Sequence, residues 1–223
     1  MATRLEIISD VICPWCYIGA TNLMRALEAR PDHPFDLQWR PFFLNPDMPA
    51  DGMDRRAYLE AKFGGKDGAI KAYAPVAEAA EAAGLSLDLA AIKRTPNTLD
   101  AHRVLHWAET EGAQTRVAMA LFRAYFERGA DLSEAETLAG IAGSAGCDAA
   151  VISTLLAGTS DRATITEAAA SAAQMGVTGV PTFIVGGRYV VTGCQPADLW
   201  MRVVDELAAA TAENAASAGA TTQ

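Results

Sequence analysis

The sequence predicts an α/β fold in which a small sheet is interrupted by a large all-helical insertion. Within the 223 residues, a strand–helix–strand pattern opens the chain, a long series of helical segments follows, and two short strands and a helix close it. A hydrophobic fraction of 51% provides enough apolar side chains for a buried core. The first and last parts together predict one four-stranded α/β unit.

The first part of the chain alternates between extended and helical patterns. Residues 4–9 contain an apolar run typical of a buried strand. Residues 14–29 repeat apolar side chains at helical spacing, and residues 35–40 alternate apolar and polar side chains as a strand does. A loop punctuated by prolines follows at residues 41–49.

The middle of the chain is predicted to be a succession of helices. Gly84, Gly112 and Gly129 stand where helix C-caps are expected, and Ser133 with Glu136 matches a capping box. The predicted helices are residues 54–63, 69–83, 98–111, 113–128, 133–145, 148–156 and 160–174.

Strands return near the C-terminus. Residues 182–185 and 188–191 are predicted as two strands, and Gly186 and Gly187 between them favour a two-residue hairpin turn. Pro196 precedes a last helix predicted at residues 197–210. Residues 211–223, mostly Ala, Thr, Ser and Asn, are expected to be a disordered tail.

A CPWC motif at residues 13–16 follows the first strand. Because Cys16 lies one helical turn after Cys13, the two sulfurs can close one small ring, and free backbone N–H groups at the helix start favour a thiolate at Cys13. Half of a zinc site, or two buried thiols, are the alternatives. An all-cysteine zinc site would need a second such pair, whereas Cys147 and Cys194 are isolated. We therefore interpret Cys13 as a redox nucleophile and Cys16 as its partner.

A proline precedes the strand predicted at residues 182–185. Pro181 donates no ladder hydrogen bond, and a cis bond after Val180 would let the preceding backbone pair with an extended substrate. An ordinary trans turn proline is the alternative. The combination with the CPWC motif favours the cis interpretation.

Five motifs are distinctive in combination: CPWCYIG after Ser9 and Asp10, and the segments at residues 39–42, 44–49, 97–103 and 179–183. Together they resemble the FrnE-like branch of the DsbA family of thioredoxin-fold oxidoreductases. The resemblance implies a thioredoxin-like fold with a helical insertion, a redox-active CxxC and a facing cis proline. It implies a thioredoxin-like domain in two parts, residues 1–45 and 159–210, a helical insertion domain at residues 46–158, and a tail at residues 211–223.

The resemblance also implies roles for single residues. Cys13 resembles the nucleophilic thiol, Cys16 the resolving thiol and Pro181 the cis proline. The residues expected to contact substrate are Val180, Trp15, Pro14, His102 and Asn97. For His102, structural packing is an equally suitable role. Phe43 and Cys194 depart from the family pattern, and Cys194 is either a packed small side chain or a third thiol able to form a regulatory disulfide.

Three functional hypotheses follow. The first is a thiol–disulfide oxidoreductase that reduces, forms or isomerises disulfides through a mixed disulfide. The second is a glutathione-dependent enzyme similar to 2-hydroxychromene-2-carboxylate isomerases and kappa-class glutathione transferases, acting on a small aromatic substrate. Those relatives typically have Ser in place of Cys13 and lack the resolving thiol, so the CPWC pair favours the first hypothesis. The third is a binding or chaperone module.

The composition argues against some classes of binding partner. A net charge of −9 without a basic run argues against nucleic acid, and no apolar stretch approaches the roughly 20 residues of a membrane span. Residues 1–10 do not resemble a signal peptide, so we expect a cytoplasmic protein, monomeric or homodimeric, that acts on a disulfide-containing protein or a small thiol. Glutathione is the expected co-substrate, with no tightly bound cofactor. His102 and His106 share a helix face but lack a third ligand, so no metal site is predicted.

Overall fold

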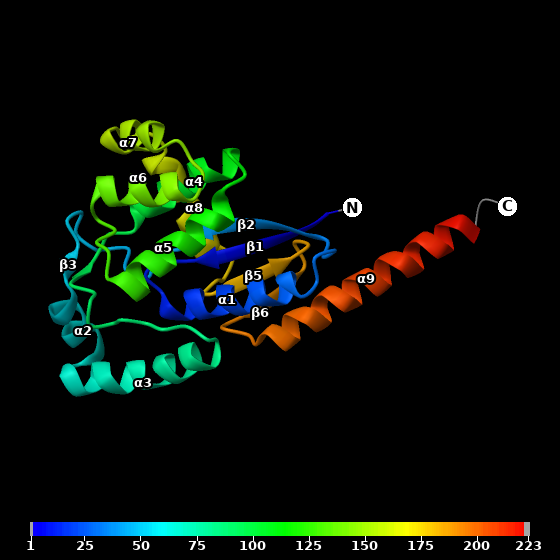
Figure 1. Cartoon of the computed structure of the whole chain (residues 1–223), viewed down its shortest axis with the longest axis horizontal. Helices are drawn as coiled ribbons and strands as arrows, with labels where there is room; N and C mark the ends of the chain where they lie inside the picture. The colour runs from blue at the N-terminus through cyan, green and yellow to red at the C-terminus, as the bar shows by residue number, and fades with distance from the viewer. Residues whose placement is uncertain (1, 221–223) are drawn as a thin grey trace.

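A four-stranded mixed sheet lies at the centre of the molecule, with strand order β2-β1-β5-β6 (Figure 1). The structure is a computed structural model that describes residues 2–220, and side chains as far as residue 210. Strand β1 (Thr3–Ser9) is parallel to β2 (Phe35–Pro41), and β5 (Thr182–Val185) is antiparallel to both β1 and β6 (Tyr189–Thr192). The chain therefore returns after a long excursion to pair its last strands with its first.

Helix α1 (Pro14–Glu28) connects the two parallel strands, as a parallel crossover requires. It packs against α9 (Ala197–Ala220), whose Trp200 and Val204 are buried. Helix α9 continues beyond residue 210 and projects away from the sheet (Figure 1). Residues 211–220 are thus helical where a disordered tail was expected, because alanine has the strongest helix propensity; residues 221–223 lie outside the described residues.

The helices between β2 and β5 rest partly on the edge of the sheet, because α4, α5 and α8 contact β2. The side-chain amide of Gln114 joins α5 to this edge: its Oε1 accepts from the Trp39 amide at 2.8 Å, and its Nε2 donates to the Trp39 carbonyl at 3.2 Å. The elements of this region are β3 (Met53–Asp54), α2 (Arg55–Phe63), α3 (Lys66–Ala82), β4 (Arg94–Thr95), α4 (Leu99–Thr110), α5 (Gln114–Arg128), α6 (Ala135–Ser144), α7 (Ala149–Ala157) and α8 (Arg162–Gln174).

The last hairpin differs slightly from its prediction. Strand β6 begins at Tyr189 rather than residue 188, because the Arg188 amide donates to the Val185 carbonyl at 3.1 Å and closes a turn. Gly186 and Gly187 occupy the two central positions with φ of 59° and 69°, a conformation that favours glycine. Among residues 2–220, no helix combines the length and apolar character needed to cross a membrane.

Candidate active site at the start of helix α1

The two cysteines of the CPWC motif lie in the first turn of α1. The chain turns sharply after β1, and the Cys13 amide donates to the Asp10 carbonyl at 3.0 Å. Cys13 is the N-cap of α1, and its own carbonyl accepts from the amides of Cys16 and Tyr17. Both thiols are free and buried, with 3% of Cys13 and 1% of Cys16 exposed. Cys16 is the less exposed of the two, although Cys13 is also well covered.

The segment before β5 lies directly beside the first cysteine. The Val180–Pro181 bond is cis, and the Cys13 Sγ lies 3.7 Å from the Val180 carbonyl oxygen. Pro181 packs against α1 at Gly19, where an added Cβ would lie 3.1 Å from the Pro181 Cγ. The two motifs that the sequence analysis combined, more than 160 residues apart, therefore meet in one site.

Burial raises the pKa of the Cys16 thiol well above its ordinary value. A hydrogen bond with Cys13 and the charge of Cys13 raise this pKa further, whereas a hydrogen bond from the Asp10 backbone lowers it. Cys16 therefore resists ionisation at neutral pH.

A buried carboxylate and an imidazole lie next to the dithiol. Asp10 is 0% exposed, and its Oδ2 accepts from the Leu44 amide at 2.9 Å. Its Oδ1 lies 3.5 Å from the Nε2 of His102, which α4 supplies. The ring of Phe43 covers the imidazole, with ring centres 5.6 Å apart. His102 was predicted from the sequence and Asp10 was not; a charged residue at the end of an apolar strand, just before the cysteines, is the signal that could have found it.

The remaining residues expected to contact substrate have different surroundings. Asn97 is engaged within the protein, because its Nδ2 donates to the Met48 carbonyl at 2.8 Å and its Oδ1 accepts from the Leu99 amide at 3.0 Å. Pro14 is buried in the first turn of α1. Trp15 is half-buried and packs against the hydrophobic core.

The helical region contributes a cation that the sequence analysis did not identify. Arg55 of α2 is 6% exposed, and its guanidinium donates to the Tyr73 hydroxyl at 2.6 Å and to the Thr95 hydroxyl at 3.2 Å. Burial raises the pKa of Tyr73, Arg55 lowers it, and the charge of Cys13 raises it slightly. Tyr73 is thus within electrostatic reach of the dithiol.

The other two cysteines occupy different places. Cys194 is partly exposed near α1, and the Asn22 amide donates to its sulfur at 3.9 Å. Burial raises the pKa of Cys194, and so does the charge of Cys13. Cys147 follows α6, and burial and the charge of Glu111 raise its pKa. Cys194 therefore belongs to the neighbourhood of the dithiol and Cys147 does not. Among the described side chains, no group of three His, Cys, Asp or Glu residues is placed to hold a metal ion.

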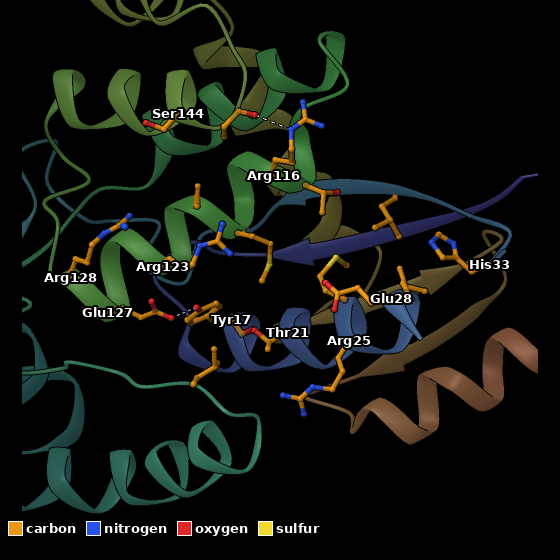
Figure 2. Close-up of a pocket in the computed structure, with 18 residues that line it drawn as sticks. Tyr17, Thr21, Arg25, Glu28, His33, Arg116, Arg123, Glu127, Arg128 and Ser144 are labelled. Carbon is orange, nitrogen blue, oxygen red and sulfur yellow. Dashed lines mark hydrogen bonds between the residues drawn. The ribbon is translucent and has the colours of Figure 1, made fainter. Parts of the chain in front are cut away.

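Two cavities lie near the dithiol segment, and neither thiol lines either of them. A cleft of about 580 Å³ is lined by the segment before the cis proline and by β5 and β6, including Met175, Val180 and Val190. A larger groove of about 980 Å³ lies between α1 and α5 and contains neither thiol of the dithiol (Figure 2). In that groove the Tyr17 hydroxyl donates to Glu127 at 2.5 Å, which ties the dithiol helix to α5.

The sheet order, the helix that follows β1 and the cis proline beside its first turn define the class of thioredoxin-fold proteins. Within this class, the model of the DSBA-like thioredoxin domain matches residues 4–204. The chain belongs to this family, which confirms the predicted fold and family.

Solved structures agree with this assignment. A probable DsbA oxidoreductase from Streptomyces coelicolor is 31% identical, with a TM-score of 0.80 over 92% of this chain and 89% of that one. 2-Hydroxychromene-2-carboxylate isomerase is 15% identical, with a TM-score of 0.68 over 95% of this chain and 98% of that one. The cytosolic disulfide reductase DsbM from Pseudomonas aeruginosa, solved with GSH, is 18% identical, with a TM-score of 0.63 over 92% and 98%. The last two similarities show the fold alone.

Proposed function

We propose that this protein is a thiol–disulfide oxidoreductase whose electrons are carried by Cys13 and Cys16. The observation that supports it most is the position of the Cys13 sulfur, at the first turn of α1 and 3.7 Å from the Val180 carbonyl. Free backbone N–H groups at the start of a helix attract negative charge, which suits an attacking sulfur at this position. The second thiol is buried one turn later and is held protonated, as suits a resolving group.

The proposed reaction has two exchange steps. The Cys13 thiolate attacks one sulfur of a substrate disulfide, the substrate S–S bond breaks, and one substrate thiolate leaves. Cys16 then attacks the Cys13 sulfur, the mixed disulfide breaks, and the second substrate thiolate leaves. The substrate gains two electrons and the protein retains a Cys13–Cys16 disulfide. The oxidising direction is the reverse, and the reduction potential of the pair decides between them.

The surroundings of Cys13 favour a narrow substrate. Only 3% of Cys13 is exposed, and Val180, whose carbonyl oxygen lies 3.7 Å from the Cys13 sulfur, lines an apolar cleft of about 580 Å³ together with Pro181. A small disulfide such as oxidised glutathione, or an extended peptide disulfide, suits this opening better than a folded surface. The DsbM structure was solved with GSH, and this supports glutathione as the co-substrate of this chain. We place the reaction in the cytoplasm, where reduction of the substrate is favoured.

The test combines labelling with turnover. Reduced protein is treated with iodoacetamide at mildly acidic pH, and peptides are quantified by mass spectrometry; Cys13 should be labelled quickly and Cys16 much more slowly. Reduction of oxidised glutathione and of insulin should be lost in Cys13→Ser and Cys16→Ser and retained in Cys147→Ser, the matched control. Equal slow labelling, or full activity without Cys13, would refute the proposal. Glutathione-dependent isomerisation that survives Cys16→Ser would support the isomerase hypothesis instead.

A further inference from the structure

The groove between α1 and α5 has the size and the lining of a small-molecule site. Its volume of about 980 Å³ is at the upper end of the range that ligand pockets occupy. Partly buried apolar side chains from separate elements line it, among them Met24, Leu37, Leu85 and Met119. These side chains also pack against the hydrophobic core, so the groove offers a supported apolar surface to a ligand.

The groove carries positive charge on a protein that is acidic as a whole. Its described lining contains two glutamates and four arginines, which are Arg25, Arg116, Arg123 and Arg128. The whole chain, in contrast, has 27 acidic residues against 18 Lys and Arg, and a formal net charge of −9. Local cationic charge in a concave site raises the local concentration of anions.

Arg123 is the cation of the groove that is available to a ligand. Arg25 donates to the Ala83 carbonyl at 2.7 Å, and Arg116 donates to the Ala145 carbonyl at 3.0 Å. Arg123, in contrast, has no hydrogen bond or ion pair with any residue that the structure describes. Figure 2 shows its side chain extending from α5 over the groove. A free guanidinium can bind a carboxylate, sulfonate or phosphate through two parallel N–H groups.

The acidic side chains of the groove do not neutralise Arg123 through an ion pair. Glu127 accepts from the Tyr17 hydroxyl at 2.5 Å and is turned toward α1 (Figure 2). Glu28 is exposed and lies toward the His33 end of the groove, away from Arg123 (Figure 2). The groove therefore combines an apolar lining with one cation that lacks a bonded partner.

We propose that the groove between α1 and α5 binds a small amphipathic anion. The apolar body of the ligand, aromatic or acyl, packs on Met24, Leu37 and Met119. Its acid group, a carboxylate, sulfonate or phosphate, binds the guanidinium of Arg123. The site is separate from the dithiol, because neither Cys13 nor Cys16 lines it, and it does not depend on the proposed redox reaction.

The experiment uses 8-anilino-1-naphthalenesulfonate, an aromatic anion whose fluorescence rises when it leaves water. The dye is titrated into the full-length protein, and octanoate and 1-octanol, which have the same chain length, are added as competitors. Arg123→Gln removes the cation, and Arg202→Gln on an exposed part of α9 is its control. Ala120→Glu places a carboxylate in the groove, and Ala120→Gln is the uncharged control of the same size. Val190→Gln alters the cleft of about 580 Å³ instead.

We expect saturable binding of one dye molecule per chain. The Kd should be at least about fivefold higher in Arg123→Gln than in Arg202→Gln, and at least about fivefold higher in Ala120→Glu than in Ala120→Gln, because charge-assisted hydrogen bonds are stronger than neutral ones. Octanoate should displace the dye at a lower concentration than 1-octanol. Val190→Gln and Cys13→Ser should bind the dye as the parent protein does, so the result is independent of the proposed function.

Four outcomes would overturn the inference. They are the absence of saturable binding, equal Kd values in either pair of variants, displacement by 1-octanol as effective as that by octanoate, and loss of binding in Val190→Gln, which would place the dye in the other cleft. Circular dichroism checks that each variant is folded. Arg123 is exposed, so Arg123→Gln leaves the core unchanged and stays decisive if a substitution of Ala120 disturbs folding.

Discussion

Replacing Arg103 should destabilise the helical region strongly. Its side chain is 0% exposed and holds the chain between α7 and α8, because its guanidinium donates to the carbonyls of Leu155, Gly158 and Ser160 at 2.8, 3.0 and 2.7 Å. It also lies over the Trp107 ring at 4.8 Å. Hydrogen bonds from a charged donor contribute about 1.5 kcal/mol each, so Arg103→Ala should lower the free energy of unfolding by about 4 kcal/mol. For a chain of this length, the melting temperature should fall by about 8 to 16 °C.

Arg162 offers a matched control for this prediction. It donates to the Asp100 carboxylate at 3.0 Å, as Arg103 does at 2.8 Å, but its side chain is 41% exposed. Arg162→Ala should therefore lower the stability by less than about 1 kcal/mol, as exposed ion pairs do. Urea unfolding followed by circular dichroism measures both variants. Two results would refute the conclusion that the buried hydrogen bonds to carbonyls stabilise the protein. One is a free energy of unfolding for Arg103→Ala within about 1 kcal/mol of the parent value, and the other is an equal loss of stability in both variants.

Two further predictions concern the dithiol. Gly19→Ala places a Cβ 3.1 Å from the Pro181 Cγ, so it should lower the free energy of unfolding by about 1 kcal/mol or more and slow disulfide exchange. The control is Gly140→Ala, whose Cβ meets no atom within 4 Å and which should have neither effect. Burial raises the pKa of Cys16 in the folded protein. The protonated thiol therefore makes its full contribution to the stability of the reduced fold at pH values below the unfolded thiol pKa of about 8.5, and this contribution is lost as the pH rises above that value. Urea unfolding should therefore show a steeper alkaline loss in the reduced parent than in Cys16→Ser, and identical slopes would contradict it.

The sheet and the dithiol were predictable because their signals are local. Period-two patterns, a glycine pair and the CPWC spacing report on neighbouring residues, and the structure places the four strands of the central sheet within two residues of their predicted bounds. Pro181 was predictable because it precedes a strand and accompanies CPWC. Helix starts were less predictable: α6 begins at Ala135 without the expected capping box, since the Ser133 amide and hydroxyl both donate to Asp131.

The rest of the site depends on long-range packing that no local pattern reports. Asp10 becomes important because α4 brings His102 to it, and a sequence separation of 92 residues conceals that meeting. Arg55 resembles a solvated helix residue in the sequence, but Tyr73 and Thr95 surround it in the structure. Asn97 could be recognised as part of a motif, whereas its engagement with Met48 could not.

The two edge strands of the sheet differ in how far their backbone hydrogen-bonding groups are occupied. Strand β2 is an edge strand, and the Gln114 carboxamide occupies the Trp39 amide and carbonyl as a neighbouring strand would. At Trp39 this side chain blocks pairing with another chain, and α4, α5 and α8 also contact β2, which guards against aggregation. Among the described strands, β6 has β5 as its single neighbour, and Tyr189 and Val190 are exposed on it. Any strand that joins this sheet from outside therefore meets an open ladder at β6 and a blocked one at β2.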